Sequence, residues 1–313
     1  MKGKELMSRT TKILSAIVAV LAGVYAIQKF TTKTSTTQTS RPFADLDTSK
    51  VTALNVNFGE DIRLQKVAGS WNVVSPILFP ADPGQMSMVL TRLASNPSAS
   101  IVADNLSDSS AYGLGGGAGS VSVSTSSGKS MTFRIGNATP DLNGTYISME
   151  GEPEVFQLAT NLRPLFGRSL TGWRDKRIFN IPVSDIASLD LALGDTLFHF
   201  TRNDTSWNVN GVSIPSVKAE GLAGDIVGAM ATGFVDSTLS PSKVMLDYGI
   251  TLLSREHLTG QVFKSAESEF SFGEMCISNS ANNQIYTIAP TFPEYLVREL
   301  LAIKKAYLSR ESS

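Results

Sequence analysis

The sequence predicts an α+β fold: two tandem homologous units of mostly antiparallel sheet, with helices packed on one face, after a single N-terminal transmembrane helix. Three observations lead to this prediction: an internal repeat, an order of elements that is not strict strand–helix alternation, and one uncharged apolar run near the N-terminus. The 313 residues are therefore divided into five parts. These are a cytoplasmic basic segment (1–12), a transmembrane anchor (13–28), a flexible tether (29–42), repeat unit 1 (43–168) and repeat unit 2 (169–310).

The internal repeat rests on three matched stretches. Residues 49–59 match residues 184–194, Trp71-Asn72-Val73 matches Trp207-Asn208-Val209, and Tyr112-Gly113-Leu114 matches Tyr248-Gly249-Ile250. The tryptophan and the tyrosine lie 41 residues apart in both copies. A repeat of this length indicates two structural units of small-domain size. Because both copies keep these residues, we expect the fold, and not a reaction, to require them.

Each unit is expected to open with a β-hairpin. Partial alternation of apolar residues predicts first strands at 51–58 and 186–193. A glycine beside acidic residues, Gly59 in one unit and Gly194 in the other, predicts the turn that follows.

A helix is expected after each hairpin. Trp71 and Trp207 end the return strands. Both are expected to be buried in the core, because a large ring anchors a hairpin to the element that packs over it. Asp82-Pro83-Gly84-Gln85 is typical of an N-cap, a proline at the first helical position and a capping-box glutamine. In the second unit Ser216 is the candidate cap, and Gly233 is expected to end the helix.

The second half of each unit is expected to hold another strand pair. This pair falls at 121–124 and 131–135 in the first unit, and roughly at 258–264 and 269–272 in the second. The first unit also carries an extra strand around Tyr146, which we expect the second unit to lack.

A further matched strand and a closing helix complete each unit. The strand is predicted at 154–158 and at 284–288. For the last helix, Thr291 and Glu294 form a candidate capping box around Pro293.

Composition excludes several functional classes. Only 18% of residues are charged and the net charge is −1, so no strong field exists to attract nucleic acid. The single cysteine, Cys276, cannot form an intramolecular disulfide and is expected to be a small buried hydrophobe. His199 and His257 are distant in the sequence and cannot close a zinc site with one cysteine. We therefore expect no enzyme activity, no catalytic residue, no cofactor and no bound metal.

The N-terminal forty residues predict a location. Residues 13–28 carry no charge, and four basic residues precede them: Lys2, Lys4, Arg9 and Lys12. A basic flank before an apolar run places the N-terminus in the cytoplasm and the body outside the inner membrane, with the lipid bilayer contacting residues 13–28. The run is short for a spanning helix, so cleavage as a signal peptide stays an alternative. Residues 31–40 are polar throughout and are expected to form a flexible stalk.

The segment that joins the two units holds the only candidate site residues. Trp173 and Phe179 could line a ligand cleft between the units, since pockets favour domain interfaces. Arg174 and Lys176 could form a basic docking patch, although a charged run of this kind is usually a solvated turn.

These features together resemble a known bacterial family. The residues that carry the likeness are Ser49 to Gly59, the strand of Trp71, Ala81-Asp82, Tyr112-Gly113-Leu114, Ile135 to Pro140 with Tyr146, and Trp173 to Lys176 with Phe179. They resemble the bacterial domain of unknown function 4340 over about residues 43–310. The resemblance implies an N-terminally anchored extracytoplasmic protein. It also implies an association with transporters that pair an ATPase with a membrane permease, including some linked to gliding motility. It implies no reaction and no catalytic residues.

Two functions from different classes follow from the sequence. The first is a non-catalytic accessory or scaffold subunit of a membrane complex, acting through protein–protein contacts and including a transporter permease among its candidate partners. The second is a ligand-binding module for lipid, glycan or peptide that uses the cleft between the units.

Overall fold

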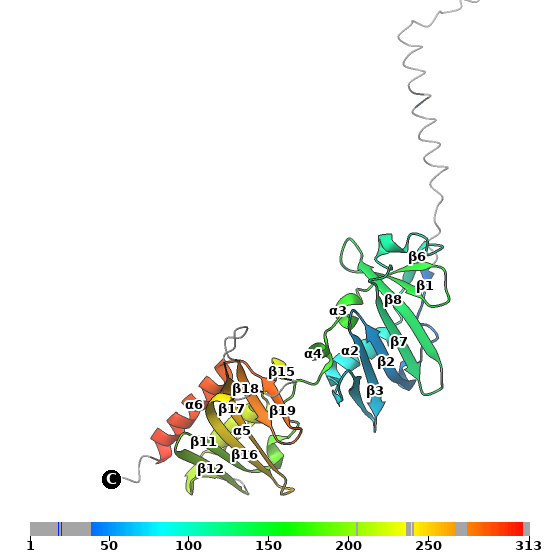
Figure 1. Ribbon diagram of the computed structural model, residues 1–313. Coiled ribbons are helices and arrows are strands. Elements are labelled where there is room, and N and C mark those ends of the chain that lie inside the picture. The colour runs from blue at the N-terminus through cyan, green and yellow to red at the C-terminus, as the bar shows by residue number, and fades with distance from the viewer. Residues whose placement is uncertain are drawn as a thin grey trace, which may run out of the picture. The chain divides into compact units, whose positions relative to one another are not determined.

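The fold belongs to the predicted α+β class. The computed structural model describes residues 39–204, 206–235, 241–266 and 274–308, together with the single residues 18, 20 and 239. It contains two sheets of mostly antiparallel strands and few helices (Figure 1). The predicted basic segment, almost all of the anchor and most of the tether lie outside the described residues. Among the residues that are described, no helix is both long and apolar enough to cross a membrane.

The chain divides into two compact units. The first holds Met1–Gln65 and Ser87–Gly167, and the second holds Lys66–Met86 and Arg168–Ser313. The sequence places residues 66–86 within the first repeat, whereas their contacts group them with the second unit.

The first sheet has ten strands in the order β1-β6-β10-β9-β8-β7-β2-β3-β4-β5. Their bounds are β1 Thr39–Ser40, β2 Val51–Asn57, β3 Asp61–Val67, β4 Ser70–Ser75, β5 Phe79–Pro80, β6 Ala99–Ala103, β7 Gly119–Thr125, β8 Ser130–Ala138, β9 Thr145–Met149 and β10 Val155–Leu158. The accompanying helices are η1 Thr48–Lys50, α2 Pro83–Ala94, η2 Ser109–Tyr112, α3 Arg163–Phe166 and α4 Leu170–Trp173.

The second sheet has nine strands in the order β14-β13-β12-β11-β16-β17-β18-β19-β15. Their bounds are β11 Ile186–Leu193, β12 Thr196–Asn203, β13 Ser206–Val209, β14 Val212–Ile214, β15 Gly233–Val235, β16 Pro241–Leu252, β17 His257–Ser265, β18 Met275–Asn279 and β19 Gln284–Thr287. The accompanying helices are η3 Val183–Asp185, α5 Ser216–Val227, α6 Thr291–Ile303 and the π-helical turn η4 Lys304–Leu308.

The two sheets share one strand order. When the strands are numbered from β2 and from β11, nine strands of each sheet read 5-9-8-7-6-1-2-3-4, and β1 is an addition at the end of the first sheet. A helix of 12 residues, α2 or α5, follows the fourth strand in each. The first strands also carry a register shift at the same place. It lies between Val51 and Ala53 where β2 pairs β7, and between Ile186 and Ser188 where β11 pairs β16. Bulges of this kind are specific features of a sheet, so their agreement extends the match beyond strand order.

The third sequence match of the repeat is wrong. Tyr112 ends η2 ahead of β7, whereas Tyr248 lies within β16 opposite Leu191. The residue that matches Leu191 in the first sheet is Val56, and Val56 lies opposite Val121. The two glycines differ as well, because Gly113 caps η2 with φ 70° while Gly249 is an ordinary strand residue. The equal spacing from the tryptophans is therefore a coincidence.

The second unit does not lack a counterpart of the Tyr146 strand. β18 occupies the position in the second sheet that β9, which contains Tyr146, occupies in the first. β16 pairs with β17 and takes the place predicted for the strand pair, while residues 269–272 lie outside the described residues.

The helix signals were correct in some places and wrong in others. Asp82 Oδ1 accepts a hydrogen bond from Gln85 N at 2.9 Å, which confirms the predicted N-cap of α2. α5 begins at Ser216 but ends at Val227 with Gly228 as its C-cap, so Gly233 does not end it and instead opens β15. Thr291 opens α6 without a side-chain cap bond, so the capping box is not formed.

Apolar residues from strands and helices form the core of the second unit. The buried cluster combines inward-facing residues of β11, β12, β13 and β16 with residues of α5 and α6. Trp207 belongs to it and is 1% exposed, as predicted. Trp71 is only half-buried, so the expectation that both tryptophans plug a core holds for one of them. Phe79 of β5 also belongs to this cluster, which explains why residues 66–86 group with the second unit.

Candidate functional site

Most of the candidate site residues in the joining segment are buried. Trp173, Arg174 and Phe179 expose 0%, 1% and 4% of their surface, and only Lys176 is half-buried. Phe179 packs edge-on against Tyr248 with ring centroids 5.6 Å apart. As placed, neither aromatic ring offers free surface to a ligand, and the guanidinium of Arg174 offers none to a docking partner.

Arg174 stacks on aromatic rings inside the second unit. Its guanidinium carbon lies 4.3 Å from the ring centroid of Phe79 and 3.7 Å from that of Phe234. Its Nη2 donates a hydrogen bond to Gln284 Oε1 at 3.2 Å. A desolvated cation over an aromatic face is stabilised by about 2 kcal/mol. Arg174 therefore ties β5 to β15 and β19, which is a structural role.

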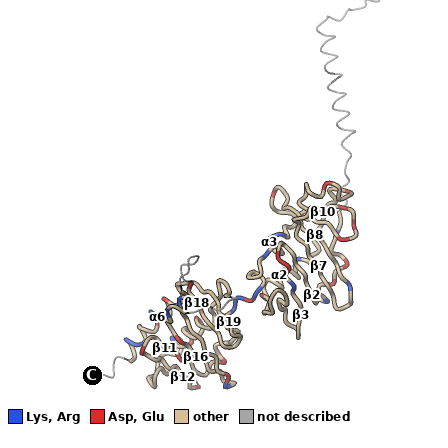
Figure 2. Tube along the Cα trace, viewed as in Figure 1, with Lys and Arg blue, Asp and Glu red and all other residues tan. Residues whose placement is uncertain are grey.

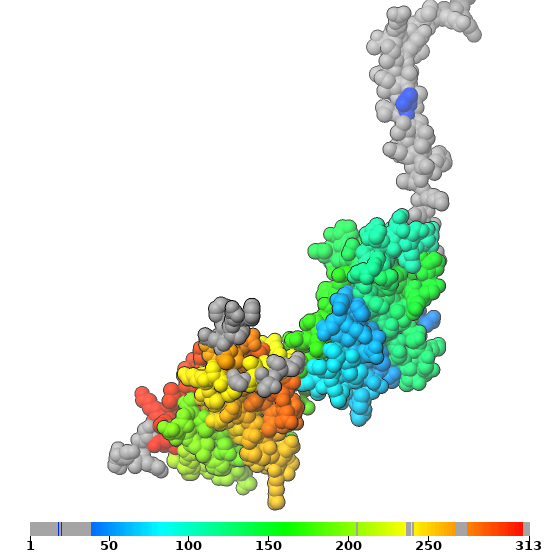
Figure 3. All heavy atoms as spheres, viewed as in Figure 1, coloured from blue at the N-terminus to red at the C-terminus, as the bar shows by residue number. Residues whose placement is uncertain are grey.

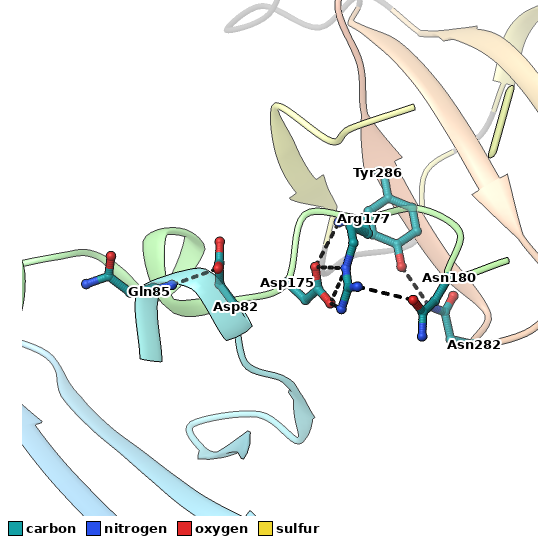
Figure 4. A network of polar contacts seen from close by, with 7 residues as sticks. All are labelled: Asp82, Gln85, Asp175, Arg177, Asn180, Asn282 and Tyr286. Carbon is teal, nitrogen blue, oxygen red and sulfur yellow. Dashed lines mark hydrogen bonds and ion pairs between the residues drawn. The ribbon is translucent and has the colours of Figure 1, made fainter. Parts of the chain in front are cut away.

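The residues that follow Arg174 take part in a polar network (Figure 4). Arg177 donates from Nη2 to Asp175 Oδ2 at 2.6 Å and from Nη1 to Asn180 Oδ1 at 3.1 Å. The bond with Asp175 raises the pKa of Arg177 above its ordinary value, so the guanidinium stays protonated. Nearby, Asn282 Nδ2 donates to the hydroxyl of Tyr286 at 2.6 Å, and burial raises the pKa of that phenol. These side chains form hydrogen bonds with one another, which is typical of a rigid turn.

The two histidines of the chain lie on the same sheet around Asp190. His199 Nδ1 lies 2.5 Å from Asp190 Oδ1 across β12 and β11. His257 Nδ1 lies 3.0 Å from Thr251 Oγ1, and its ring extends over Gly249. A Cβ built on Gly249 would lie 3.1 Å from His257 Cε1 and 3.5 Å from Asp190 Cβ. The sequence alone does not predict this arrangement, because the residues are far apart in the chain and meet only through the pairing of distant strands.

In the described part of the chain, no group of three or more histidine, cysteine, aspartate or glutamate side chains is arranged to hold a metal ion. Cys276 is fully buried, and burial raises the pKa of its thiol to about 11. A protonated, enclosed thiol is a poor nucleophile, so Cys276 acts as a packing residue.

The first unit carries an open cavity of about 640 Å³ beside the segment that follows residue 42. Three parts of the chain form its walls: residues 42–50, the β7–β8 turn with the start of β8, and the turn that follows β9. Figure 3 shows the atoms of the first of these segments in blue against the green atoms of the neighbouring strands. The lining residues are Pro42, Asp45, Leu46, Asp47, Lys50, Thr125, Ser127, Lys129, Ser130, Met131, Thr132, Met149, Glu150 and Glu152.

A second cavity of about 290 Å³ adjoins the first. The two share Thr132, Met149, Glu150 and Glu152, so we treat them as one feature, the β9 groove. The second cavity extends over the polar face of β7, β8 and β9, where Ser120 lies opposite Arg134 and Arg134 lies opposite Ser148. The groove thus combines an apolar floor, hydroxyl groups and charged rims, which is a composition typical of binding sites.

Acidic side chains predominate around the β9 groove. Asp47 Oδ2 forms an ion pair with Lys50 Nζ at 3.0 Å. The pKa of Asp47 is lowered, chiefly by the hydrogen bond from the hydroxyl of Ser49. In Figure 2, acidic segments lie around β8 and β10 of the first unit. Among the described residues, Asp45, Glu150 and Glu152 have no ion-pair partner, while Lys129 is the one unpaired cation of the larger cavity.

The sequence contains no direct sign of the β9 groove. Its walls come from segments roughly a hundred residues apart, joined through the pairing of β2 with β7 and of β8 with β9. The one available signal was the cluster Glu150, Glu152 and Glu154 after a strand, which also fits a plain surface turn.

Comparison with known proteins identifies a family. The family model described as "Domain of unknown function (DUF4340)" matches residues 71–247, more than half of the chain. The match begins in β4, ends within β16 and includes two of the three walls of the β9 groove. No curated protein and no solved structure matches the chain significantly. The chain therefore belongs to the DUF4340 family.

Proposed function

We propose that this protein is a non-catalytic accessory or scaffold subunit of a membrane protein complex, and that it acts through protein–protein contacts. Residues 13–28 anchor it in the inner membrane, with the N-terminus in the cytoplasm and the folded body outside. A transporter permease is the partner that the family resemblance suggests. Anchoring raises the effective concentration of the body toward other membrane proteins, so even modest contacts become effective.

Two tandem homologous units form the body in this proposal. Support comes from the identical strand order of the two sheets and from the shared register shift after Val51 and Ile186. A duplicated sheet gives a scaffold two similar surfaces that can diverge, one to keep a contact and the other to change it.

The proposed anchor is supported by its two described residues. Val18 and Val20 are both helical, and they expose 60% and 65% of their surface. Exposed valines on a helix gain free energy when lipid replaces water around them. The neighbouring run is uncharged and follows four basic residues, the pattern that orients a span with its N-terminus inside.

The β9 groove is the single observation that carries the proposed contact function. It is an open surface feature, and its wall begins at Pro42, the last residue of the proposed tether. A groove close in sequence to the tether is within reach of partners that are anchored in the same membrane. Its mixed composition, with methionines below and charges at the rim, is typical of protein contact surfaces.

Copurification tests this function. The full chain, tagged after Ser313, would be extracted from its native membranes with a mild detergent and analysed by mass spectrometry. We expect at least one integral membrane protein to copurify in stoichiometric amount and to dissociate at high salt. Recovery of the chain as a lone monomer under several mild detergents would contradict the proposal.

A fusion experiment tests the topology separately. Alkaline phosphatase fused after Ser313 should be active, and a fluorescent protein that fails to fold outside the cytoplasm should be dark there. The reverse pattern would place the body in the cytoplasm and remove the basis of the proposal.

A further inference from the structure

We propose that the β9 groove binds an extended segment of a partner protein in which a basic residue lies next to an apolar one. This inference deepens the proposed function and rests on it, because it names the contact surface and the chemistry of the segment that fits it. Three features of the groove carry the inference: its floor, its rim and one buried hydroxyl.

The floor of the groove is apolar and adaptable. Met149 is 7% exposed, and Met131 and Leu46 beside it are half-buried. Methionine is flexible and polarizable, so a floor of this kind can accept side chains of different shapes. Such a floor favours an apolar side chain of moderate size without requiring one particular residue.

The rim of the groove is acidic once internal pairs are considered. Lys50 forms an ion pair with Asp47, whereas Arg134 of the smaller cavity donates from Nη2 to the neutral carbonyl of Gly115 at 2.6 Å and keeps its positive charge. Asp45, Glu150 and Glu152 are exposed and form no ion pair with another described residue. Lys129 and Arg134 oppose these three carboxylates, so the three negative charges exceed the two positive charges by one. Complementary charge therefore favours lysine or arginine in the partner segment.

A buried hydroxyl points to backbone contacts with the bound segment. Ser148 lines the smaller cavity and is only 3% exposed, yet its hydroxyl forms no hydrogen bond with another described residue. The hydroxyl is open to the cavity, so a peptide N–H or carbonyl group at this position could take the place of water as its hydrogen-bond partner.

The shape of the groove favours an extended segment. The two cavities adjoin along β9 and continue over the polar face of β7 and β8. A ligand that reaches both the carboxylates beside the larger cavity and Ser148 in the smaller one has to run along the groove. An extended peptide does so while presenting alternate side chains to the floor and to the rim.

Selection from a peptide library tests this inference. The full chain in detergent would be presented to phage displaying random hexapeptides, beside the variant E150K/E152K. A second variant, D195K/E256K, changes the net charge equally but on exposed positions of the second unit. We expect wild-type protein and D195K/E256K to enrich lysine or arginine next to an apolar residue. E150K/E152K should lose that preference and select acidic peptides, and a synthetic wild-type-selected peptide should bind it at least about fivefold more weakly.

The result separates this inference from the proposed function. No enrichment over empty micelles, or a basic preference that survives in E150K/E152K, would overturn the groove as a binding site. If a membrane partner copurifies equally with E150K/E152K, the proposed function stands and the groove is not its contact surface. If the selected peptides bind but no partner copurifies, the proposed function fails on its own. The reversed preference expected of E150K/E152K is a gain of binding, so it cannot arise from misfolding.

Discussion

At the scale of single residues, burial decides which side chains serve the fold. Arg174 is charged and stands in a polar run, and these properties suggested a docking patch. Its 1% exposure and its stacking on Phe79 and Phe234 give it a structural role instead. The sequence could not show this, because both aromatic partners come from distant segments.

Replacing Arg174 should destabilise the protein. Arg174→Lys keeps the charge but loses the planar stacking, and we expect a loss of about 2–4 kcal/mol in the free energy of unfolding. Arg177→Lys is the matched control, since that side chain is 43% exposed and its pair with Asp175 should contribute no more than about 1 kcal/mol. Urea titrations followed by circular dichroism compare the two variants. An equal, small effect of both substitutions would show that the stacking contributes little.

Three tyrosines make the second unit sensitive to alkali. Burial raises the pKa of Tyr248 and Tyr286, and the hydrogen bond from Tyr295 to Asp225 raises the pKa of Tyr295 to about 12. Their folded pKa values exceed the ordinary value of 10, so folding favours the protonated phenols. The stability that they contribute is full below pH 10 and is lost as the pH rises from 10 toward 12.

The alkaline loss can be measured by urea unfolding at several pH values. Stability should fall between pH 10 and 12 in wild-type protein and fall less steeply in Tyr295→Phe, which has no phenol at that position. Tyr307→Phe serves as a matched control, because Tyr307 is half-buried like Tyr295 but its hydroxyl forms no hydrogen bond with another described residue. Stability that stays constant up to pH 12 would contradict this prediction.

At the scale of elements, local sequence signals succeeded where local chemistry determines the structure. The hairpins beginning at Val51 and Ile186 and the start of α2 follow from alternation and from the Asp82 cap. The local signals failed where pairing between distant strands determines the structure. Tyr248 lies in a central strand, and β18 follows a segment without clear alternation. Gly233 opens an edge strand because β19 is available to pair with it, which no local pattern reveals.

The helix caps give a paired prediction. Asp82→Ala removes the hydrogen bond to the backbone of Gln85, and we expect it to cost about 1 kcal/mol of stability. Thr291→Ala removes a residue that looks like a cap in the sequence but forms no side-chain cap bond in the structure. It should change stability by less than about 0.5 kcal/mol. Thermal and urea unfolding of both variants check this, and a larger effect for Thr291→Ala would mean that the capping box forms after all.

At the scale of the whole molecule, the repeat in the sequence and the compact units in space do not coincide. The sequence assigns residues 66–86 to the first repeat unit, but contacts place them with the second compact unit. Phe79 is the reason, since it is 8% exposed and belongs to the buried cluster of that unit. Sequence comparison follows ancestry, whereas contacts follow burial, so the two divisions can differ.

Truncating Phe79 should destabilise the second unit. Phe79→Ala removes a ring from the buried cluster, and we expect a loss of about 3–5 kcal/mol. Leu78→Ala is the matched control, because Leu78 is 78% exposed. Hydrogen exchange read by mass spectrometry should show faster exchange in β15 and β19 for Phe79→Ala alone. Unchanged exchange there would mean that residues 66–86 contribute little to the stability of the second unit.

The most direct test of the central claim is photo-crosslinking in intact membranes. A photoreactive amino acid would be placed at Glu150 in the β9 groove or, as a control, at Glu256 in the second unit. If this protein is an anchored scaffold that uses the groove, position 150 should give one discrete adduct with an integral membrane protein, and position 256 should not. Adducts with cytosolic proteins, or no adduct from position 150 or any other groove position, would contradict the account.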